Sequence, residues 1–424
     1  MKKGYKLVKS LFGKYEEIPD DWDVKQIDSL GKIVTGSTPS TSIREFYDDG
    51  QFLWVTPPDL ESVKYVTTTQ TKLSKKGFEQ TRKLPPKSVL VTCIGTVGRT
   101  GIGMQKMATN QQINAVIATN VDHEFLYYQL SYNHEKIKNM ANQAVVPILN
   151  KTDFGTIKIL IPASEKEQQK IASILSNVDS LINQTQKEIE QTQRLKKGLM
   201  QKLLTKGIGH TRFKKVKSLF GKYEEIPKEW NLKRLNDIGQ IIGGGTPDST
   251  INEYWNGEIL WAVPTDITKL SSNFISETER KITEKGLTES SAKLLPIGTV
   301  LITTRATIGE CAINTKPIAT NQGFQNLICD DENDRHFMFY AIKFHRNKLL
   351  RLSYGTTFPE ISKSEIKKVL IALPESRIEQ QKIASILSNI DSQIQKQQEY
   401  KSKLETLKKG LMQKLLTGQI RVKM

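Results

Sequence analysis

The side chains of this chain that are best suited to chemistry are basic. Several Lys and Arg residues lie in or beside two segments, residues 60–83 and 266–294, which differ between two similar halves of the sequence. Residues 120–150 and 328–358 also differ between the halves. An arginine can pair with guanine through two hydrogen bonds, and a lysine can neutralise a phosphate. At any single position a solvated surface charge is the commoner role, so we predict nucleic-acid contact for the group rather than for each member. The candidates are Lys72, Lys75, Lys76, Arg82, Lys87 and Arg99 in the first half and Lys269, Arg280, Lys281, Lys285, Lys293 and Arg305 in the second.

Residue types that commonly catalyse reactions or bind metals form no recognisable pattern. Cys93, Cys311 and Cys329 form no CxxC pair, and the five histidines recur at no spacing typical of metal ligands. The sequence contains no GxxxxGK[ST] nucleotide-binding loop and no convincing cluster of acidic metal ligands. We therefore expect no catalytic residue, no metal and no cofactor in this chain.

The composition favours a protein that binds a polyanion. The chain has 424 residues, with 62 Lys and Arg against 45 Asp and Glu, a formal net charge of +17 and a pI near 9.5. Neutralising phosphates releases counterions, so the excess favours nucleic acid, although general solubility would explain it too. No uncharged stretch approaches the roughly 18 to 20 residues that a membrane span requires. The basic residues at the start are not followed by an apolar run of the length found in signal peptides. We expect a soluble protein of the reducing cytoplasm.

The chain consists of two copies of one unit. The residues KSLFGKYEEIP occur at 9–19 and again at 217–227, and a period of about 210 residues leaves room for complete domains in each copy. Glycine and proline in this segment predict an extended connector with docked aromatic side chains, or a plain linker. We divide the chain into a connector at 1–20, a mixed domain at 21–162, a long helix at 163–206, a second connector at 207–228, a second mixed domain at 229–374, and a second long helix with a tail at 375–424.

Each mixed domain is predicted to be α+β. Short β-rich runs such as 88–95 and 298–304 end in turns with glycine, whereas 125–140 has apolar residues at helical spacing. We interpret the residues that match between the copies as framework, with the tryptophans in the core and the divergent segments as two different surfaces. The matched motifs are GSTP at 36–39 with GGTP at 244–247, Trp54 with Trp261, and Asn110-Gln111 with Asn321-Gln322.

Residues 167–205 and 379–417 align without gaps and predict two long helices. Apolar residues recur at heptad positions a and d and are interrupted by polar residues, which indicates a coiled coil. We expect the helices, each about 58 Å long, to pair antiparallel with each other, although each could pack on its own domain instead. Gly198 and Gly410 predict a close contact or a kink, or reflect duplication. The apolar seam residues are Ile171, Leu175, Val178, Ile182, Ile189, Leu199, Leu203, Ile383, Leu387, Ile390, Ile394, Leu404, Leu411 and Leu415.

The order of these motifs resembles the specificity subunits of type I restriction-modification enzymes. The resemblance rests on GSTP or GGTP followed by LWVTPPDL or LWAVPTDI, on the ATNQ tetrapeptides at 108–111 and 319–322, and on the EQQKIASILSN helices. It covers essentially the whole chain. It implies two target recognition domains, each reading one half of a bipartite, asymmetric target in double-stranded DNA. It also implies that the helices set the gap between the halves and bind methyltransferase subunits.

The same resemblance implies a chain without catalytic activity. Two modification subunits would transfer methyl groups from S-adenosylmethionine, and restriction or translocase subunits would use ATP and Mg. The sequence agrees, because it has no NPPF-like or DPPY-like methyltransferase motif, and TPPD at 56–59 lacks the aromatic residue. Two other hypotheses stay open: a nuclease acting alone, and a basic RNA- or DNA-binding coiled-coil scaffold without sequence specificity.

Overall fold

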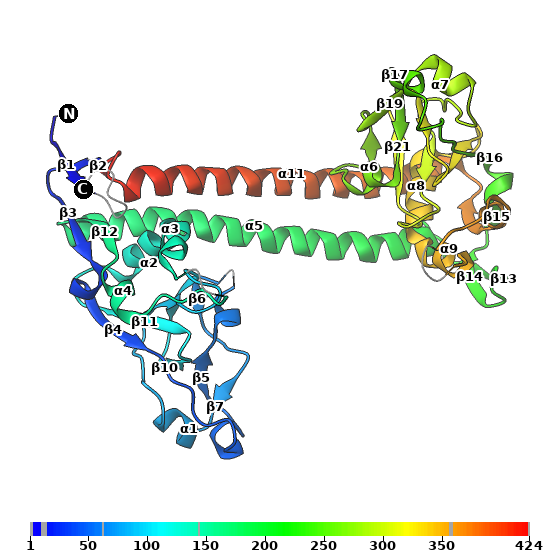
Figure 1. Ribbon diagram of the computed structural model, residues 1–424. Helices are drawn as coiled ribbons and strands as arrows, with labels where there is room; N and C mark the ends of the chain where they lie inside the picture. Colours follow the sequence, from blue (N-terminus) through cyan, green and yellow to red (C-terminus); the bar gives the residue numbers. More distant parts are fainter. Residues whose placement is uncertain (1–2, 10–14, 62, 143–144, 356–358, 423–424) are drawn as a thin grey trace. The chain divides into compact units, whose positions relative to one another are not determined.

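The computed structural model describes residues 3–9, 15–61, 63–142, 145–355 and 359–422 (Figure 1). The chain divides into two compact units. Unit 1 is Met1–Gln184 with Lys401–Met424, and unit 2 is Thr185–Tyr400. Each unit contains one sheet-rich domain and a part of each of two long helices, α5 (Glu165–Lys206) and α11 (Arg377–Leu416). The fold class is therefore α+β, as the sequence predicts.

Among the described residues of unit 1, the sheet-rich domain has a five-stranded and a three-stranded sheet. The first has the order β4-β11-β8-β9-β6, with all neighbours antiparallel except β9 and β6. The second has the order β10-β5-β7, with β10 parallel and β7 antiparallel to β5. Two further antiparallel pairs are β3 with β12 and β1 with β2. The strands are β1 Tyr5–Lys9, β2 Tyr15–Pro19, β3 Trp22–Gln26, β4 Gly31–Thr35, β5 Phe52–Val55, β6 Tyr65–Val66, β7 Lys72–Leu73, β8 Val89–Thr92, β9 Thr100–Gly103, β10 Met107–Thr109, β11 Ile113–Ala118 and β12 Lys158–Pro162.

The described part of unit 2 repeats this topology strand for strand. Its five-stranded sheet has the order β16-β23-β20-β21-β18, and its three-stranded sheet has the order β19-β17-β22. The directions match those in unit 1, including the parallel pairs β18 with β21 and β17 with β22. The strands are β13 Phe213–Lys217, β14 Tyr223–Pro227, β15 Trp230–Arg234, β16 Gly239–Gly243, β17 Trp255–Ala262, β18 Phe274–Ile275, β19 Arg280–Ile282, β20 Val300–Ile302, β21 Cys311–Asn314, β22 Ile318–Thr320, β23 Gln325–Cys329 and β24 Leu370–Pro374.

Short helices connect the strands in the same places in both units. The run at 125–140, predicted as one helical stretch, forms two helices because Asn133 separates them. Asn133 has φ and ψ of −91° and 13°, outside the α-helical region, and its side chain donates to the Gln129 carbonyl at 2.9 Å. The helices of unit 1 are η1 Ile27–Ser29, η2 Arg44–Phe46, η3 Pro57–Leu60, α1 Lys75–Glu79, α2 His123–Tyr132, α3 His134–Met140 and α4 Lys151–Gly155. Those of unit 2 are η4 Leu235–Asp237, η5 Asn252–Tyr254, α6 Pro264–Thr268, α7 Glu284–Thr288, α8 Arg335–Phe344, α9 Arg346–Leu352 and α10 Lys363–Lys367.

The repeated segment KSLFGKYEEIP contributes to a β-hairpin rather than to an extended connector. In unit 2, β13 and β14 pair antiparallel, and Ser218 N–H donates to the Lys222 carbonyl at 2.7 Å across the turn. Gly221 has a φ of +76°, a left-handed conformation that glycine adopts readily. In unit 1, β1 and β2 pair in the same way, while residues 10–14 lie outside the described part. Glycine therefore marks a tight turn between two strands here, not a break in regular structure.

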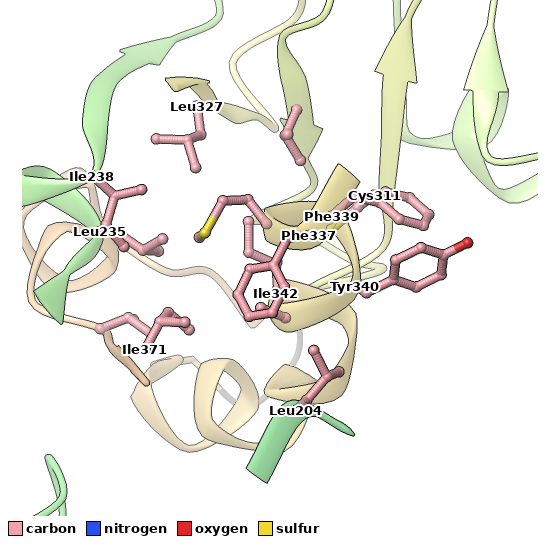
Figure 2. Close-up of a cluster of buried hydrophobic side chains, with 14 of the residues drawn as sticks. Leu204, Leu235, Ile238, Cys311, Leu327, Phe337, Phe339, Tyr340, Ile342 and Ile371 are labelled. Atoms are coloured by element: carbon pink, nitrogen blue, oxygen red, sulfur yellow. The ribbon is translucent and has the colours of Figure 1, made fainter. Parts of the chain in front are cut away.

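The core of unit 2 surrounds α8, which is buried on all its faces over 337–342. Figure 2 shows part of this cluster, in which side chains of α8 lie among residues of the sheet domain and Leu204 of α5. Leu204 belongs to α5, so the apolar core is continuous with the long helix. Unit 1 has an equivalent cluster, to which α2 contributes Phe125 and α5 contributes Ile171. Each sheet-rich domain is therefore held on the long helices by a shared apolar core.

Within each unit, α5 and α11 run antiparallel. In unit 2, Lys196 of α5 pairs with Asp391, and Ile208, just after α5, donates to Glu379 at 3.0 Å. The seam residues named above are buried or half-buried in both helices. The prediction of a close contact at Gly198 and Gly410 is wrong, because a Cβ added to either glycine would meet no atom within 4 Å. Both helices continue through these glycines.

Candidate nucleic-acid interface

Three motifs that are distant in the sequence meet in the first sheet-rich domain. The indole N–H of Trp54 donates to the Ser37 carbonyl at 3.1 Å. Ser37 N–H donates to the Thr109 carbonyl at 2.8 Å, and Asn110 N–H donates to the Val55 carbonyl at 3.0 Å. The GSTP segment, the β5 tryptophan and the ATNQ segment are therefore joined by hydrogen bonds.

The second domain builds the same framework with its own copies of these motifs. The indole N–H of Trp261 donates to the Gly245 carbonyl at 2.9 Å. Gly245 N–H donates to the Thr320 carbonyl at 2.8 Å, and Asn321 N–H donates to the Ala262 carbonyl at 3.0 Å. Trp261 is buried, as is Trp54 at 9% exposure, so both tryptophans are part of the core and are unavailable for stacking on bases.

The matched asparagines stabilise their own loops. The Asn110 side-chain oxygen accepts from Gln112 N–H at 3.1 Å, and that of Asn321 accepts from Gly323 N–H at 2.9 Å. These turns keep the ATNQ segments in place after β10 and β22. A structural role therefore explains both asparagines.

The matched glutamines are exposed beside these loops. Gln111 accepts a hydrogen bond from the Thr38 hydroxyl, and Gln322 accepts one from the Thr246 hydroxyl. The two pairs present the same chemistry in both domains. They therefore offer no chemistry that differs between the two domains.

In the first domain, Lys72, Lys75 and Lys76 lie close together in the chain, on β7 and α1. The helix α1 lies directly on η2, because a Cβ on Gly77 would fall 2.2 Å from the Phe46 carbonyl oxygen. Gly286 in α7 packs equally closely on η5, so the two divergent segments occupy the same position on the framework. Lys76 pairs with Glu45 at 2.7 Å, and this hydrogen bond lowers the pKa of the Glu45 carboxyl.

The other basic candidates of the first domain do not join this group. Lys87 precedes β8, whereas Arg99 follows the turn after β8, and its backbone N–H donates to the Thr92 hydroxyl at 2.9 Å. Lys87 and Arg99 therefore lie at opposite ends of β8. Arg82 lies beside the framework, where its guanidinium donates to the Thr35 carbonyl at 2.9 Å. The basic candidates of this domain thus lie at separate positions, and their contact with nucleic acid stays a prediction.

In the second domain, Arg280 on β19 has the most defined geometry. Its guanidinium carbon lies 3.8 Å from the ring centre of Trp255 and 5.1 Å from that of Trp261. Stacking on tryptophan holds a guanidinium in place while its N–H groups stay available. Lys281 follows it on the same strand. Arg280 is exposed, so it is suited to bidentate contact with a base or a phosphate.

The remaining candidates of the second domain are mostly paired with carboxylates. Lys269 lies 3.1 Å from Glu279, and Lys285 pairs with Glu253. Arg305 lies in the β20–β21 turn, apart from β19 and α7, and its guanidinium is 2.7 Å from Glu360. Exposed ion pairs of this kind contribute little to stability. The Lys and Arg side chains can therefore leave their carboxylates and bind phosphates with little loss of free energy.

Five of the candidate lysines have no ion pair among the described residues. Four of them are exposed and Lys281 is half-buried, and all five add to the positive potential of their domains. They are Lys72, Lys75, Lys87, Lys281 and Lys293.

Two groups of charged residues have roles that the sequence patterns above do not indicate. Asp179 and Asp391 on the long helices bind tyrosines of the sheet-rich domains, and Arg421 clamps the C-terminal tail to Glu167. The signal for the first group is present in the sequence, because Asp391 follows Asp179 by 212 residues, the spacing that relates the two helices.

Neither a metal centre nor a reactive cysteine emerges from the residues that the structure describes. No group of three or more His, Cys, Asp or Glu side chains there could hold a metal ion. Burial raises the pKa of the Cys93 and Cys311 thiols to about 12, so both remain protonated at neutral pH. Within the same residues, no helix is long and apolar enough to cross a membrane.

Comparison with known proteins identifies the family. The model of the type I restriction modification DNA specificity domain matches residues 19–191 and again residues 227–406. The two matches cover both copies of the repeat, including most of each long helix.

Two relatives come from Methanocaldococcus jannaschii. The MjaVIII type I restriction enzyme specificity subunit is 27% identical over 430 residues, which cover 96% of this chain and 94% of the relative. The MjaIX specificity subunit is 42% identical over 185 residues, but this match covers only 43% of each chain. Specificity subunits are not catalytic, and other subunits carry out modification and cleavage.

A solved structure shares the fold. The S subunit of a type I restriction-modification system from M. genitalium has a TM-score of 0.59 and 15% identity, over 93% of this chain and 96% of that one. The repeated family match and the nearly full-length match to the MjaVIII specificity subunit lead to one conclusion. The chain belongs to the type I restriction-modification DNA specificity family and is a DNA specificity subunit of such a system.

Proposed function

We propose that each sheet-rich domain reads one half of a bipartite, asymmetric DNA target. We take the recognition domains as 21–162 and 229–374. The observation that carries the proposal is that both domains share one framework and one strand order, while the residues at 60–83 and 266–294 differ. Two domains with the same fold and different surfaces are suited to binding two unlike DNA sequences that are separated by a constant gap.

The differing segments occupy equivalent places on that framework. α1 in one domain and α7 in the other both rest on a short helix through a glycine. Their side chains differ in kind: the first domain offers lysines on β7 and α1, and the second offers Arg280 stacked on Trp255. An arginine held in this way favours guanine, whereas lysines chiefly contribute phosphate contacts.

We also propose that the long helices set the gap between the half-sites and dock two methyltransferase subunits. The two copies present the same helix sequence at their ends, EQQKIASILSN and KKGLMQKLLT, so a partner that binds one copy can bind the other. Restriction or translocase subunits complete the assembly. The complex acts in the cytoplasm, where its DNA substrate lies. A scaffold without sequence specificity is not favoured by the family match.

The experiment removes one recognition contact at a time. Arg280→Ala, in complex with the methyltransferase partner, should relax base preference in one half-site and leave the other half-site unchanged. Loss of a bidentate contact should reduce discrimination at one position by about 1–3 kcal/mol. Arg280→Lys is the matched control for charge, since lysine retains the charge but not the bidentate geometry.

A second variant tests the first domain. Lys72→Ala combined with Lys75→Ala should weaken binding similarly for all sequences and reduce its salt dependence, because phosphate contacts carry no base preference. Base preference is read by selecting bound sequences from randomised half-sites. A substitution in one domain that altered both half-sites would contradict the proposal of two independent readers.

A further inference from the structure

A network of polar side chains joins the second domain to both long helices. Asp391 on α11 accepts hydrogen bonds from the Tyr340 hydroxyl of α8 and from the Asn273 side chain, both at 2.7 Å. The same carboxylate pairs with the ammonium group of Lys196 on α5. Figure 2 shows the Tyr340 hydroxyl directed away from the apolar cluster. One carboxylate thus connects three elements: α8, the segment before β18, and α5.

The first domain has a matching network with the helices exchanged. Here the carboxylate is Asp179 on α5, which accepts from the Tyr128 hydroxyl of α2 at 2.6 Å. It pairs with Lys408 on α11 at 2.6 Å. The ammonium group of Lys64 donates to the Tyr128 hydroxyl at 2.8 Å. The carboxylate again belongs to one helix, the lysine to the other and the tyrosine to the sheet-rich domain.

The two networks are equivalent position by position. Lys64 and Asn273 differ in type but occupy equivalent places in the two domains. The backbone oxygen of Lys64 accepts from Ile102 N–H at 2.7 Å, and that of Asn273 accepts from Ile313 N–H at 3.0 Å. The repeated members are separated by 212 residues in each case. They are Asp179 and Asp391, Tyr128 and Tyr340, and Lys196 and Lys408.

The charged side chains of both networks are partly buried, so their pairing favours one arrangement of the two helices. The side chains of Lys196 and Asp391 are 21% and 19% exposed, and those of Asp179 and Lys408 are 15% and 27% exposed. Both lysines occupy heptad positions of the seam. If the helices slid by one turn, each lysine would stay in the seam without its carboxylate, and an unpaired charge there is costly. The networks therefore favour one local register.

The tyrosines extend this constraint to the domains. Burial and the hydrogen bond to the nearby carboxylate both raise the pKa of Tyr128 and of Tyr340, so each hydroxyl keeps its proton and remains a donor. The shared apolar core holds each domain on the helices, but the hydrophobic effect itself is non-directional. A hydrogen bond to a charged acceptor does prefer one direction.

We propose that Asp179 and Asp391 are positioning residues for sequence recognition, each fixing the orientation of one recognition domain on the helices. Their effect is on the gap: they limit which separations of the half-sites the protein accepts. This inference rests on the proposed function, in which two half-sites are read at a gap set by the helices. Neither residue needs to touch DNA for this role.

The test uses the full chain with its methyltransferase partner. Duplexes carry both selected half-sites, with the gap at the preferred length or one base pair shorter or longer. Tyr340→Phe keeps the ring and removes only the hydroxyl, so the fold is retained. We expect the preference for the correct gap to fall about tenfold, the scale of one hydrogen bond to a charged group, with base preference unchanged. Asp391→Asn, which removes the charge, should act in the same direction.

The matched control is Tyr254→Phe. The Tyr254 hydroxyl donates to Glu289 at 2.6 Å, so this variant loses the same kind of bond entirely within the recognition domain. It should leave the ratio of affinities between gaps unchanged. An equal loss at every gap for Tyr340→Phe and Asp391→Asn would overturn the inference alone. A wild-type protein that accepts every gap equally would overturn the proposed function, and this inference with it.

Discussion

His345 makes the stability of unit 2 depend on pH in a way that one substitution can remove. This residue separates α8 from α9, and burial lowers the pKa of its imidazole to about 3, with a smaller effect from Lys348. The equivalent residue of the first copy is Asn133. Its φ and ψ of −91° and 13° nearly equal the −89° and 12° of His345. His345→Asn therefore removes the titratable group and keeps the backbone conformation.

The expected magnitude follows from proton linkage. The folded-state pKa lies below the unfolded value of about 6.5, so the unfolded chain takes up the proton first as pH falls. Stability is therefore unaffected well above pH 6.5, and it is lost progressively as the pH falls from there towards the folded pKa. At pH 5 this one histidine should destabilise wild-type unit 2 by about 2 kcal/mol relative to pH 7.5. The Asn variant should lack this contribution.

Hydrogen exchange as a function of urea resolves the two units. Amides of β20 and β23 report on unit 2, and those of β8 and β11 serve as an internal control in unit 1. We expect the variant to gain stability relative to wild type by about 2 kcal/mol between pH 7.5 and pH 5, in unit 2 only. An equal difference between the two proteins at both pH values would refute the assignment of a buried, neutral His345.

Three further predictions concern the helices and the tail. Gly198→Ala and Gly410→Ala should each raise stability by about 1 kcal/mol, because the added methyl meets open space; a lower melting temperature would show a contact there. Arg421→Ala should reduce exchange protection of unit 1 by about 1–2 kcal/mol by leaving buried Glu167 without its 2.7 Å partner, whereas unchanged protection would show that the tail is not clamped. Adding or deleting four residues within 181–194 should change the gap between half-sites, measured by selection, and altered half-sites at an unchanged gap would count against helices that set the gap.

Much of the fold can be read from the sequence because it depends on periodic patterns. Heptad spacing predicts the long helices, which begin at Glu165 and Arg377. Short β-branched runs predict β8 and β20. The hairpins were missed because a strand pair depends on a partner that the local pattern does not reveal, and Gly221 indicates only that the chain can turn. Asn133 separates two helices through a local change of its backbone angles, which apolar periodicity does not report.

The candidate interface is less accessible to sequence reasoning. Composition identifies basic residue types, but it does not tell that Lys87 and Arg99 lie at opposite ends of β8. The stacking of Arg280 on Trp255 joins strands β19 and β17, whose pairing is a tertiary feature. The Asp391 network brings together side chains from α5, α8 and α11. The Asp, Tyr and Lys residues of this network recur 212 residues apart in the sequence, which indicates that they are equivalent but not that they contact one another.

Selection from random duplex DNA tests whether the two recognition domains together read one split target. The protein is used with its co-expressed methyltransferase partner, at a salt concentration high enough to suppress non-specific binding. We expect enrichment of a split motif, with two unlike halves separated by a constant gap. The absence of any enriched motif, from a folded and assembled sample, would contradict it and leave a basic coiled-coil scaffold as the better description.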